Sequence, residues 1–144
     1  MIKEKTIKVA VQMDKLNKIN KDTDSTLALI QEAIKRNFSV FIYYVDNLYF
    51  EKNELKAIAN KVLSINIQKE KFLTLDVAHV INLKSFEFVL IRQDPPFNME
   101  YITATYLLER LPKSCMVLNK PNSIRDCPEK LFVMDFFNLM PPTL

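Results

Sequence analysis

The residues best suited to bind a ligand lie in three polar segments, each directly after an apolar run. These segments are Asp14, Arg92–Pro96 and Asn119–Pro121. Each apolar run predicts a strand of a sheet. In an open parallel sheet, ligands bind at the carboxyl ends of the strands, close to the point where the strand order reverses. The pattern therefore predicts a binding site at that edge of the sheet.

Arg92 is the strongest candidate within these segments. A guanidinium at a strand end can grip a carboxylate through two parallel N–H donors. Asp94, followed by Pro95 and Pro96, can position that arginine in a rigid turn. We expect both proline bonds to be trans, because cis bonds are the minority in folded proteins. The alternative for Arg92 is an ion pair with a purely structural role.

Ser25 and Thr26 follow Asp24 at the start of a predicted helix. The first N–H groups of a helix lack intrahelical partners, so they favour anions. The two hydroxyls either contact a carboxylate of a ligand or only cap the helix, and the sequence leaves both possibilities open.

Lys130 lies in the first turn of another predicted helix, where a cation opposes the helix dipole. Asp126 is the predicted N-cap of this helix. Pro128 lies in the first turn, and Glu129 is the partner of Asp126 in a capping box. A lysine placed against its local preference suggests a role outside the helix. The alternative is a solvated lysine.

Several other chemistries lack support. The chain contains no glycine, which excludes a GxGxxG dinucleotide loop and a P-loop within these residues. His79 is the only histidine, so neither a catalytic triad nor a histidine zinc site is supported. Cys115 and Cys127 form no CxxC pair and no disulfide framework, which favours a reducing, cytoplasmic setting, and Cys127 is expected to be packed. We therefore assign no catalytic nucleophile and no metal ligand.

The composition is that of a globular domain, with 144 residues of which 49% are hydrophobic and 26% charged. A net charge of +3 with scattered lysines argues against nucleic-acid binding. The longest apolar run, Val40–Val45, is too short to cross a membrane, and the N-terminal residues lack the apolar core of a signal peptide. We expect neither nucleic acid nor a membrane as partner.

Hydrophobic periodicity predicts a βαβ unit in the first part of the chain. A strand over Lys8–Met13 precedes a helix that opens at Asp24 and is closed by Asn37, and a second strand covers Ser39–Tyr44. Asn37 takes the left-handed position at the helix end that glycine usually fills. This order implies a parallel sheet with a right-handed crossover.

The hydrophobic pattern after residue 47 predicts the remaining strands of the sheet and a further helix. A turn at Lys52–Glu54 predicts a hairpin within residues 48–67, although helical spacing also fits part of that segment. The other predicted elements are strands over Phe72–Leu75, Phe88–Ile91 and Cys115–Leu118, and a helix from Asn98 to Arg110. Together they predict a three-layer, Rossmann-like α/β domain with a mainly parallel sheet and helices on both faces.

Several stretches, in order along the chain, resemble the prokaryotic glutathione synthetase family. They are residues 11–14, 19–20, 24–26, 46–49, 90–97, 104–110 and 119–132. The blocks Arg-x-Asp-Pro-Pro-Phe and Asn-Lys-Pro…Arg-Asp…Glu-Lys-Leu carry most of the specificity. The resemblance implies a ligase that joins glycine to γ-glutamylcysteine with ATP and Mg²⁺, through an acyl phosphate that the glycine amine attacks.

The same resemblance implies roles for individual residues. Four of them would bind the dipeptide substrate, namely Arg92, Asp94, Ser25 and Thr26. Lys130 would face the ATP phosphates, and the family assembles as homo-oligomers.

The resemblance also implies a pre-ATP-grasp N-terminal domain over residues 1–140 and the start of a connection to an ATP-grasp domain at 141–144. The glycine-rich loop and magnesium carboxylates of that domain do not occur before Leu144. We therefore expect these residues alone to bind ATP weakly and to be inactive. Two alternatives remain open: another ATP-grasp carboxylate–amine ligase, and a truncated, non-catalytic remnant or assembly module.

Apolar residues crowd the C-terminal segment, namely Leu131, Phe132, Phe136, Phe137 and Leu139. We expect them to be exposed here, because an ATP-grasp domain would ordinarily cover some of them.

Overall fold

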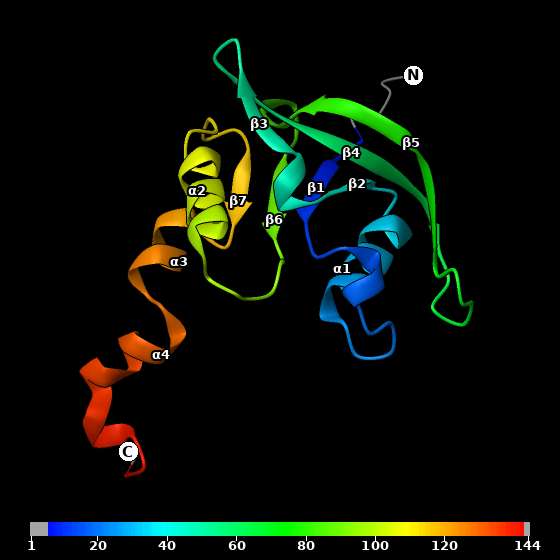
Figure 1. Cartoon of the computed structure of the whole chain (residues 1–144). Helices are drawn as coiled ribbons and strands as arrows, with labels where there is room; N and C mark the ends of the chain where they lie inside the picture. The colour runs from blue at the N-terminus through cyan, green and yellow to red at the C-terminus, as the bar shows by residue number, and fades with distance from the viewer. Residues whose placement is uncertain (1–5, 143–144) are drawn as a thin grey trace.

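The computed structural model describes residues 6–142, which form one mixed sheet with flanking helices (Figure 1). The strands are β1 (Lys8–Gln12), β2 (Ser39–Tyr43), β3 (Leu48–Glu51), β4 (Glu54–Ile65), β5 (Leu73–Asn82), β6 (Phe88–Ile91) and β7 (Met116–Leu118). The α-helices are α1 (Ser25–Lys35), α2 (Met99–Leu108), α3 (Pro121–Asp126) and α4 (Glu129–Phe132). Short 3₁₀ turns are η1 (Leu16–Lys18), η2 (Val45–Asn47), η3 (Leu83–Ser85) and η4 (Val133–Leu139).

The sheet combines a parallel and an antiparallel part. Its order is β3-β4-β2-β1-β6-β7, and β5 pairs with β4. Strands β2, β1, β6 and β7 are parallel to their neighbours within this group, whereas β4 runs antiparallel to β2, β3 and β5. The α/β prediction is confirmed, and the sheet is mixed rather than purely parallel.

The antiparallel part follows from a tight turn between β3 and β4. Lys52 and Asn53 both have positive φ angles, 50° and 61°, as the favoured two-residue hairpin turns require. This confirms the hairpin predicted at this turn. Because the turn reverses the chain, β4 enters the sheet against the direction of β2.

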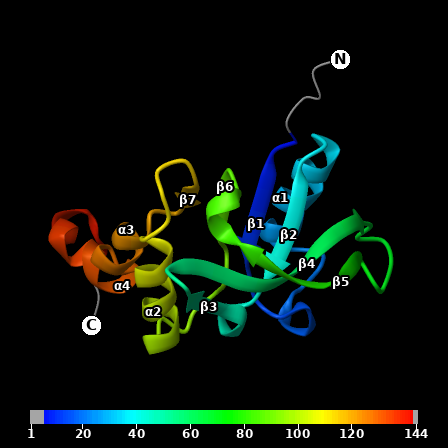
Figure 2. The same ribbon diagram turned by 90° about the horizontal axis from the view of Figure 1, so that it is seen from above.

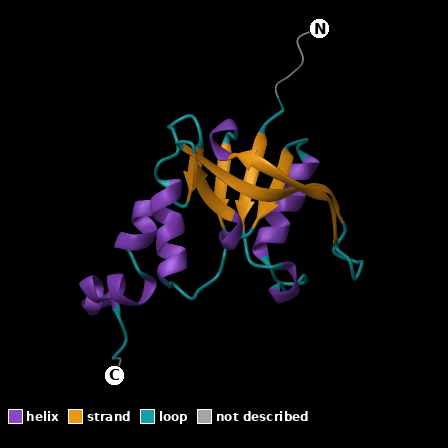
Figure 3. Cartoon of the chain, turned by 45° about the horizontal axis from the view of Figure 1, so that its top comes forward, coloured by secondary structure: helices purple, strands orange, loops and turns teal. Residues whose placement is uncertain are grey.

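Two apolar clusters lie on opposite faces of the parallel strands, so that helices flank the sheet on both sides (Figure 3). Val11 and Ile42 pack with Leu27 of α1 on one face. Ala10 and Val89 pack with Leu108 of α2 on the other. The three-layer arrangement therefore follows from alternation along the strands.

Helix α1 begins and ends where its sequence signals predicted. Asp24 accepts hydrogen bonds from the backbone N–H groups of Thr26 and Leu27, at 2.7 and 3.0 Å. Asn37, with φ of 61°, follows the helix in the left-handed conformation. Asn98 likewise caps α2 by accepting from the N–H of Tyr101 at 3.0 Å.

Two sequence-based predictions of elements were wrong. Strand β5 continues to Asn82, far beyond the predicted Leu75, because it pairs along β4 as an edge strand whose exposed residues need not alternate. Asp126 does not cap a helix: it is the last residue of α3, which starts early because Pro121 occupies its first turn. The next helix, α4, begins at Glu129 without a side-chain cap.

Within residues 6–142, no helix is both long and apolar enough to traverse a lipid bilayer.

Candidate functional site

The carboxyl ends of β1, β2 and β6 lie at one edge of the sheet, because the three strands are parallel neighbours. The chain leaves β1 through α1 to reach β2 on one side, whereas β6 pairs with β1 on its other side. The strand order therefore reverses at β1, which is the position where ligands bind in open α/β sheets. Asp14 and Arg92 follow the ends of β1 and β6, as the sequence predicted.

Arg92 is fixed to both β1 and α1. Its backbone N–H donates to the carbonyl of Gln12 at 2.7 Å, which continues the β1–β6 pairing. Its Nη2 donates to Ser25 Oγ at 2.7 Å, and its Nε lies 3.4 Å from Thr26 Oγ1. The structure thus brings together three of the predicted site residues, although they are far apart in the sequence.

This cluster retains capacity to bind an anion. A guanidinium has five N–H donors, and Ser25 and Thr26 accept from two of those of Arg92. No other residue of 6–142 accepts from the remaining donors of Arg92. Ser25 is exposed while Thr26 is buried, so the cluster lies at the protein surface at the start of α1. A carboxylate can therefore reach the guanidinium from solvent and bind two donors.

Asp94 is held by its backbone rather than by its side chain. Its N–H donates to Asp14 Oδ2 at 2.6 Å, and its own side chain is exposed. The bond between Pro95 and Pro96 is cis, contrary to the trans bond that we expected. Asp14 therefore fastens the loop after β6 to the end of β1.

Tyr101 lines the cavity that also contains Lys130, and its phenol is influenced by the charges at the strand ends. Burial raises the pKa of its hydroxyl, the charges of Asp14 and Asp94 raise it further, and the charge of Arg92 opposes this. The phenol thus lies among the charged groups at the strand ends while its ring contacts that of Phe97, with centroids 5.1 Å apart. In the sequence, the only local sign that Tyr101 lies near the strand ends was its position three residues after Asn98, the cap of α2.

A polar cavity of about 370 Å³ opens beside Asp94 at these strand ends. Its charged lining consists of Asp14, Lys15, Lys18, Asp46, Asp94 and Glu100. Lys15 and Asp46 form an ion pair across it at 2.8 Å. Arg92 does not line this cavity, because its side chain extends to α1 instead.

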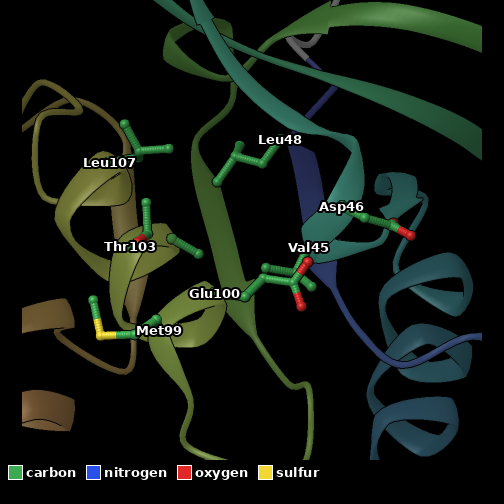
Figure 4. A pocket seen from close by; sticks show the side chains of 8 residues that line it. Val45, Asp46, Leu48, Met99, Glu100, Thr103 and Leu107 are labelled. Atoms are coloured by element: carbon green, nitrogen blue, oxygen red, sulfur yellow. The ribbon is translucent and has the colours of Figure 1, made fainter.

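A second cavity of about 440 Å³ adjoins the first and shares Val45, Asp46 and Glu100 with it. In Figure 4, side chains of η2 and β3 face those of α2 across this space. Leu48 and Leu107 make its inner part apolar.

Lys130 lies in a different cavity, of about 790 Å³, which is also lined by Tyr101, Asn119 and Cys127. Pro95 lines this cavity, whereas Asp94 and Pro96 line the polar one. The loop after β6 therefore separates Lys130 from the polar cavity at the strand ends. Cys127 is exposed, which contradicts our expectation that it would be packed. We had argued that Lys130 opposes the dipole of its helix. Because α4 is a single turn, its dipole gives this argument little support.

Comparison with known proteins identifies the family. The family profile described as "Prokaryotic glutathione synthetase, N-terminal domain" matches residues 7–125. The chain belongs to this family. The predicted family resemblance is confirmed, and the matched region includes Arg92 and both hydroxyl residues of α1.

Individual glutathione synthetases cover nearly the whole chain. Proteins of this name from Rhodopseudomonas palustris and Bradyrhizobium diazoefficiens are each 45% identical, over 96% of this chain and 44% of their own length. One from Buchnera aphidicola subsp. Schizaphis graminum is 38% identical over 100% of this chain and 45% of its own length. The chain thus spans less than half the length of these glutathione synthetases.

Proposed function

We propose that this chain is the dipeptide-binding part of a cytoplasmic glutathione synthetase, the ATP-dependent ligase that joins glycine to γ-glutamylcysteine. Residues 1–140 would form this part, and residues 141–144 would begin the connection to an ATP-grasp part. The cluster of Arg92, Ser25 and Thr26 carries the proposal, because it offers guanidinium and hydroxyl donors at the switch point of the sheet.

The cluster suits the glutamyl end of the dipeptide. That end carries an α-carboxylate that takes no part in the reaction, so it can be held throughout the catalytic cycle. Arg92 binds this carboxylate through two N–H donors, and Ser25 adds a hydroxyl. Asp94 keeps the loop in place through its backbone bond to Asp14.

The reacting carboxylate, at the cysteinyl end, then extends toward Lys130. Lys130 lines a cavity that contains none of Arg92, Ser25 and Thr26, so the two ends of one dipeptide would meet different side chains. Lys130 contributes an ammonium group that attracts ATP phosphates to this side. Holding the dipeptide at its distant end orients the reacting end and reduces its freedom to move.

Phosphoryl transfer itself needs ATP and Mg²⁺. Among residues 6–142, no group of three or more His, Cys, Asp and Glu side chains is arranged to hold a metal ion. The role that we propose for this chain is to bind and orient the dipeptide.

A titration of the ¹⁵N-labelled chain with γ-glutamylcysteine, followed by NMR, tests the proposal. We expect shifts of the backbone signals of Ser25, Thr26, Arg92 and Asp94, with a dissociation constant of about 1 mM or lower. The matched control ligand is 4-aminobutyryl-cysteine, which lacks only the glutamyl α-carboxylate and should bind at least tenfold more weakly. Equal binding of the two ligands, or shifts confined to other parts of the sheet, would refute the proposal.

A further inference from the structure

Gln12, the last residue of β1, places a polar side chain in a fully buried position. Its exposed fraction is 0%, and its register partners are Tyr43 on β2 and Ile91 on β6. Figure 2 shows β1 between these two strands. Positions 10 and 12 share one face of β1, and Ala10 packs with Leu108 of α2. The side chain of Gln12 therefore lies on this face of the sheet, the α2 face.

The buried position is costly for a glutamine. Oε1 of Gln12 accepts no hydrogen bond from any residue of 6–142. A buried carbonyl without a partner lowers the free energy of unfolding. Methionine is unbranched and carries no such carbonyl, so it would fill the same place at a lower cost. The other polar atom of the side chain indicates what the glutamine contributes.

Nε2 of Gln12 donates a hydrogen bond to Oε1 of Gln93, in the loop after β6. The residues on either side of Gln93 are also tied to the end of β1. Arg92 donates its backbone N–H to the carbonyl of Gln12, and Asp94 donates its backbone N–H to a carboxylate oxygen there. Those two bonds fix the backbone of the loop. The bond between Gln12 and Gln93 fixes a side chain of the loop, and it holds that side chain on the α2 face.

The direction of Gln93 is linked to that of Arg92. Side chains of successive residues in an extended segment point to opposite faces of a sheet. Gln93 reaches Gln12 on the α2 face. Arg92 reaches Ser25 and Thr26 at the start of α1, which packs on the other face. Restraining Gln93 on one face therefore keeps the guanidinium on the other.

We propose that Gln12 is a positioning residue for Arg92. Its amide restrains Gln93 on the α2 face, and this directs the guanidinium toward α1, where a dipeptide carboxylate can bind two of its donors. Gln12 is buried and acts only through Gln93. This inference rests on the proposed function for its consequence, but the orientation of Arg92 can be measured without any ligand.

NMR relaxation of the Arg92 side chain in Gln12→Met tests the proposal. We expect the order parameter of the Nε–H group to fall below about 0.6, the level of a flexible group, from a higher value in the unaltered chain. The backbone N–H of Arg92 should stay protected from hydrogen exchange in both forms, because β1 and β6 still pair. An unchanged order parameter would overturn the proposal. Loss of the backbone protection would do so too, because the substitution would then have loosened the sheet as a whole.

A second variant removes the same bond from its half-buried side. Gln93→Met should release the Arg92 side chain as much as Gln12→Met does. The double variant should release it no further than either single one, as expected of two residues that act through one bond. Additive effects in the double variant would contradict the proposal.

Val89→Ala is the matched control, because Val89 is also fully buried on the α2 face and belongs to β6. It should lower the melting temperature and leave the order parameter of the Arg92 side chain unchanged. Release of Arg92 in this control would show that any loss of core packing frees the side chain. Gln12 would then have no specific positioning role.

Ligand binding tests the consequence for the proposed function. γ-Glutamylcysteine should bind Gln12→Met roughly twofold to tenfold more weakly, the range that corresponds to the net contribution of one hydrogen bond. 4-Aminobutyryl-cysteine, which lacks the α-carboxylate, should bind both forms equally. Equal losses for the two ligands would contradict an action through Arg92. If the unaltered chain bound neither ligand, the proposed function would fail, whereas the relaxation measurement would still decide the role of Gln12.

Discussion

Arg92 and Ser25 are 67 positions apart in the sequence, yet Nη2 of Arg92 donates a hydrogen bond to Ser25 Oγ at 2.7 Å. The contact exists because β6 pairs with β1, and α1 begins in the loops that follow β1. The position of α1 and the orientation of the guanidinium are consequently linked. Changes that loosen the start of α1 should therefore disturb the candidate site.

The Asp24 cap tests this link. Asp24→Ala removes the acceptor for the N–H groups of Thr26 and Leu27, which should cost roughly 0.5–2 kcal/mol of stability. We expect a lower melting temperature by circular dichroism and weaker dipeptide binding by NMR. Asp22→Ala is the control, because Asp22 is exposed and lies outside the helix. If both variants bound the dipeptide equally well, the start of α1 would not position the site.

Cys115 should make the fold sensitive to alkaline pH. Burial of the thiol raises its pKa to about 11, and the charge of Glu87 adds to this. In the unfolded chain the thiol ionises near its ordinary pKa of about 8.5, so the unfolded state loses its proton first. The free energy of unfolding should thus be constant below that pH and fall as the pH rises, by roughly 1 kcal/mol at about pH 9.5.

Urea unfolding between about pH 7.5 and 9.5 measures this loss. The upper limit avoids Tyr43, whose pKa burial also raises and which adds the same effect only above its ordinary value near 10. Cys115→Ala should flatten the pH dependence, whereas Cys127→Ala, at an exposed position, should retain it. An unchanged slope in Cys115→Ala would show that another group is responsible.

Arg125 should hold α3 against α2. It donates to Thr105 Oγ1 at 3.1 Å, pairs with Glu109 and lies over the ring of Tyr106, 3.9 Å from its centroid. Removing these contacts with Arg125→Met should cost about 1–2 kcal/mol locally and accelerate hydrogen exchange in residues 121–126. Arg36→Met is the control, because it breaks only an exposed ion pair with Glu32 and should cost less than about 0.5 kcal/mol. Similar exchange in the two variants would mean that α3 is held by other contacts.

Local signals made much of the fold predictable. Alternation identified β1, helical spacing with Asp24 and Asn37 delimited α1, and the polar residues after each strand located Arg92. These features depend on residues that are close in the sequence. The family resemblance, in turn, suggested roles that spacing alone could not provide.

The features that were missed depend on contacts between distant segments. Strand β5 exists because it pairs with β4, and its own residues give little indication of it. The loop after β6 folds back so that the N–H of Asp94 donates to Asp14, a contact across 80 residues that no local pattern encodes. Pro121 gave a start signal for α3, but the capping pattern at Asp126 competed with it.

The dipeptide-binding role is tested most directly in a chimera in which this chain replaces the matched region of the Rhodopseudomonas palustris glutathione synthetase. The decisive measurement is the kinetics of Arg92→Lys in this chimera. Lysine retains the charge but loses the two-point grip, and a charge-assisted hydrogen bond contributes about 1.5–3 kcal/mol. We expect kcat/KM for γ-glutamylcysteine to fall roughly tenfold to a hundredfold, and further in Arg92→Ala, while the KM for ATP stays unchanged. Arg36→Lys, on the exposed end of α1, should leave both unchanged. Unaltered dipeptide kinetics in Arg92→Lys, or a defect confined to ATP, would contradict the role of Arg92 as the carboxylate-binding residue.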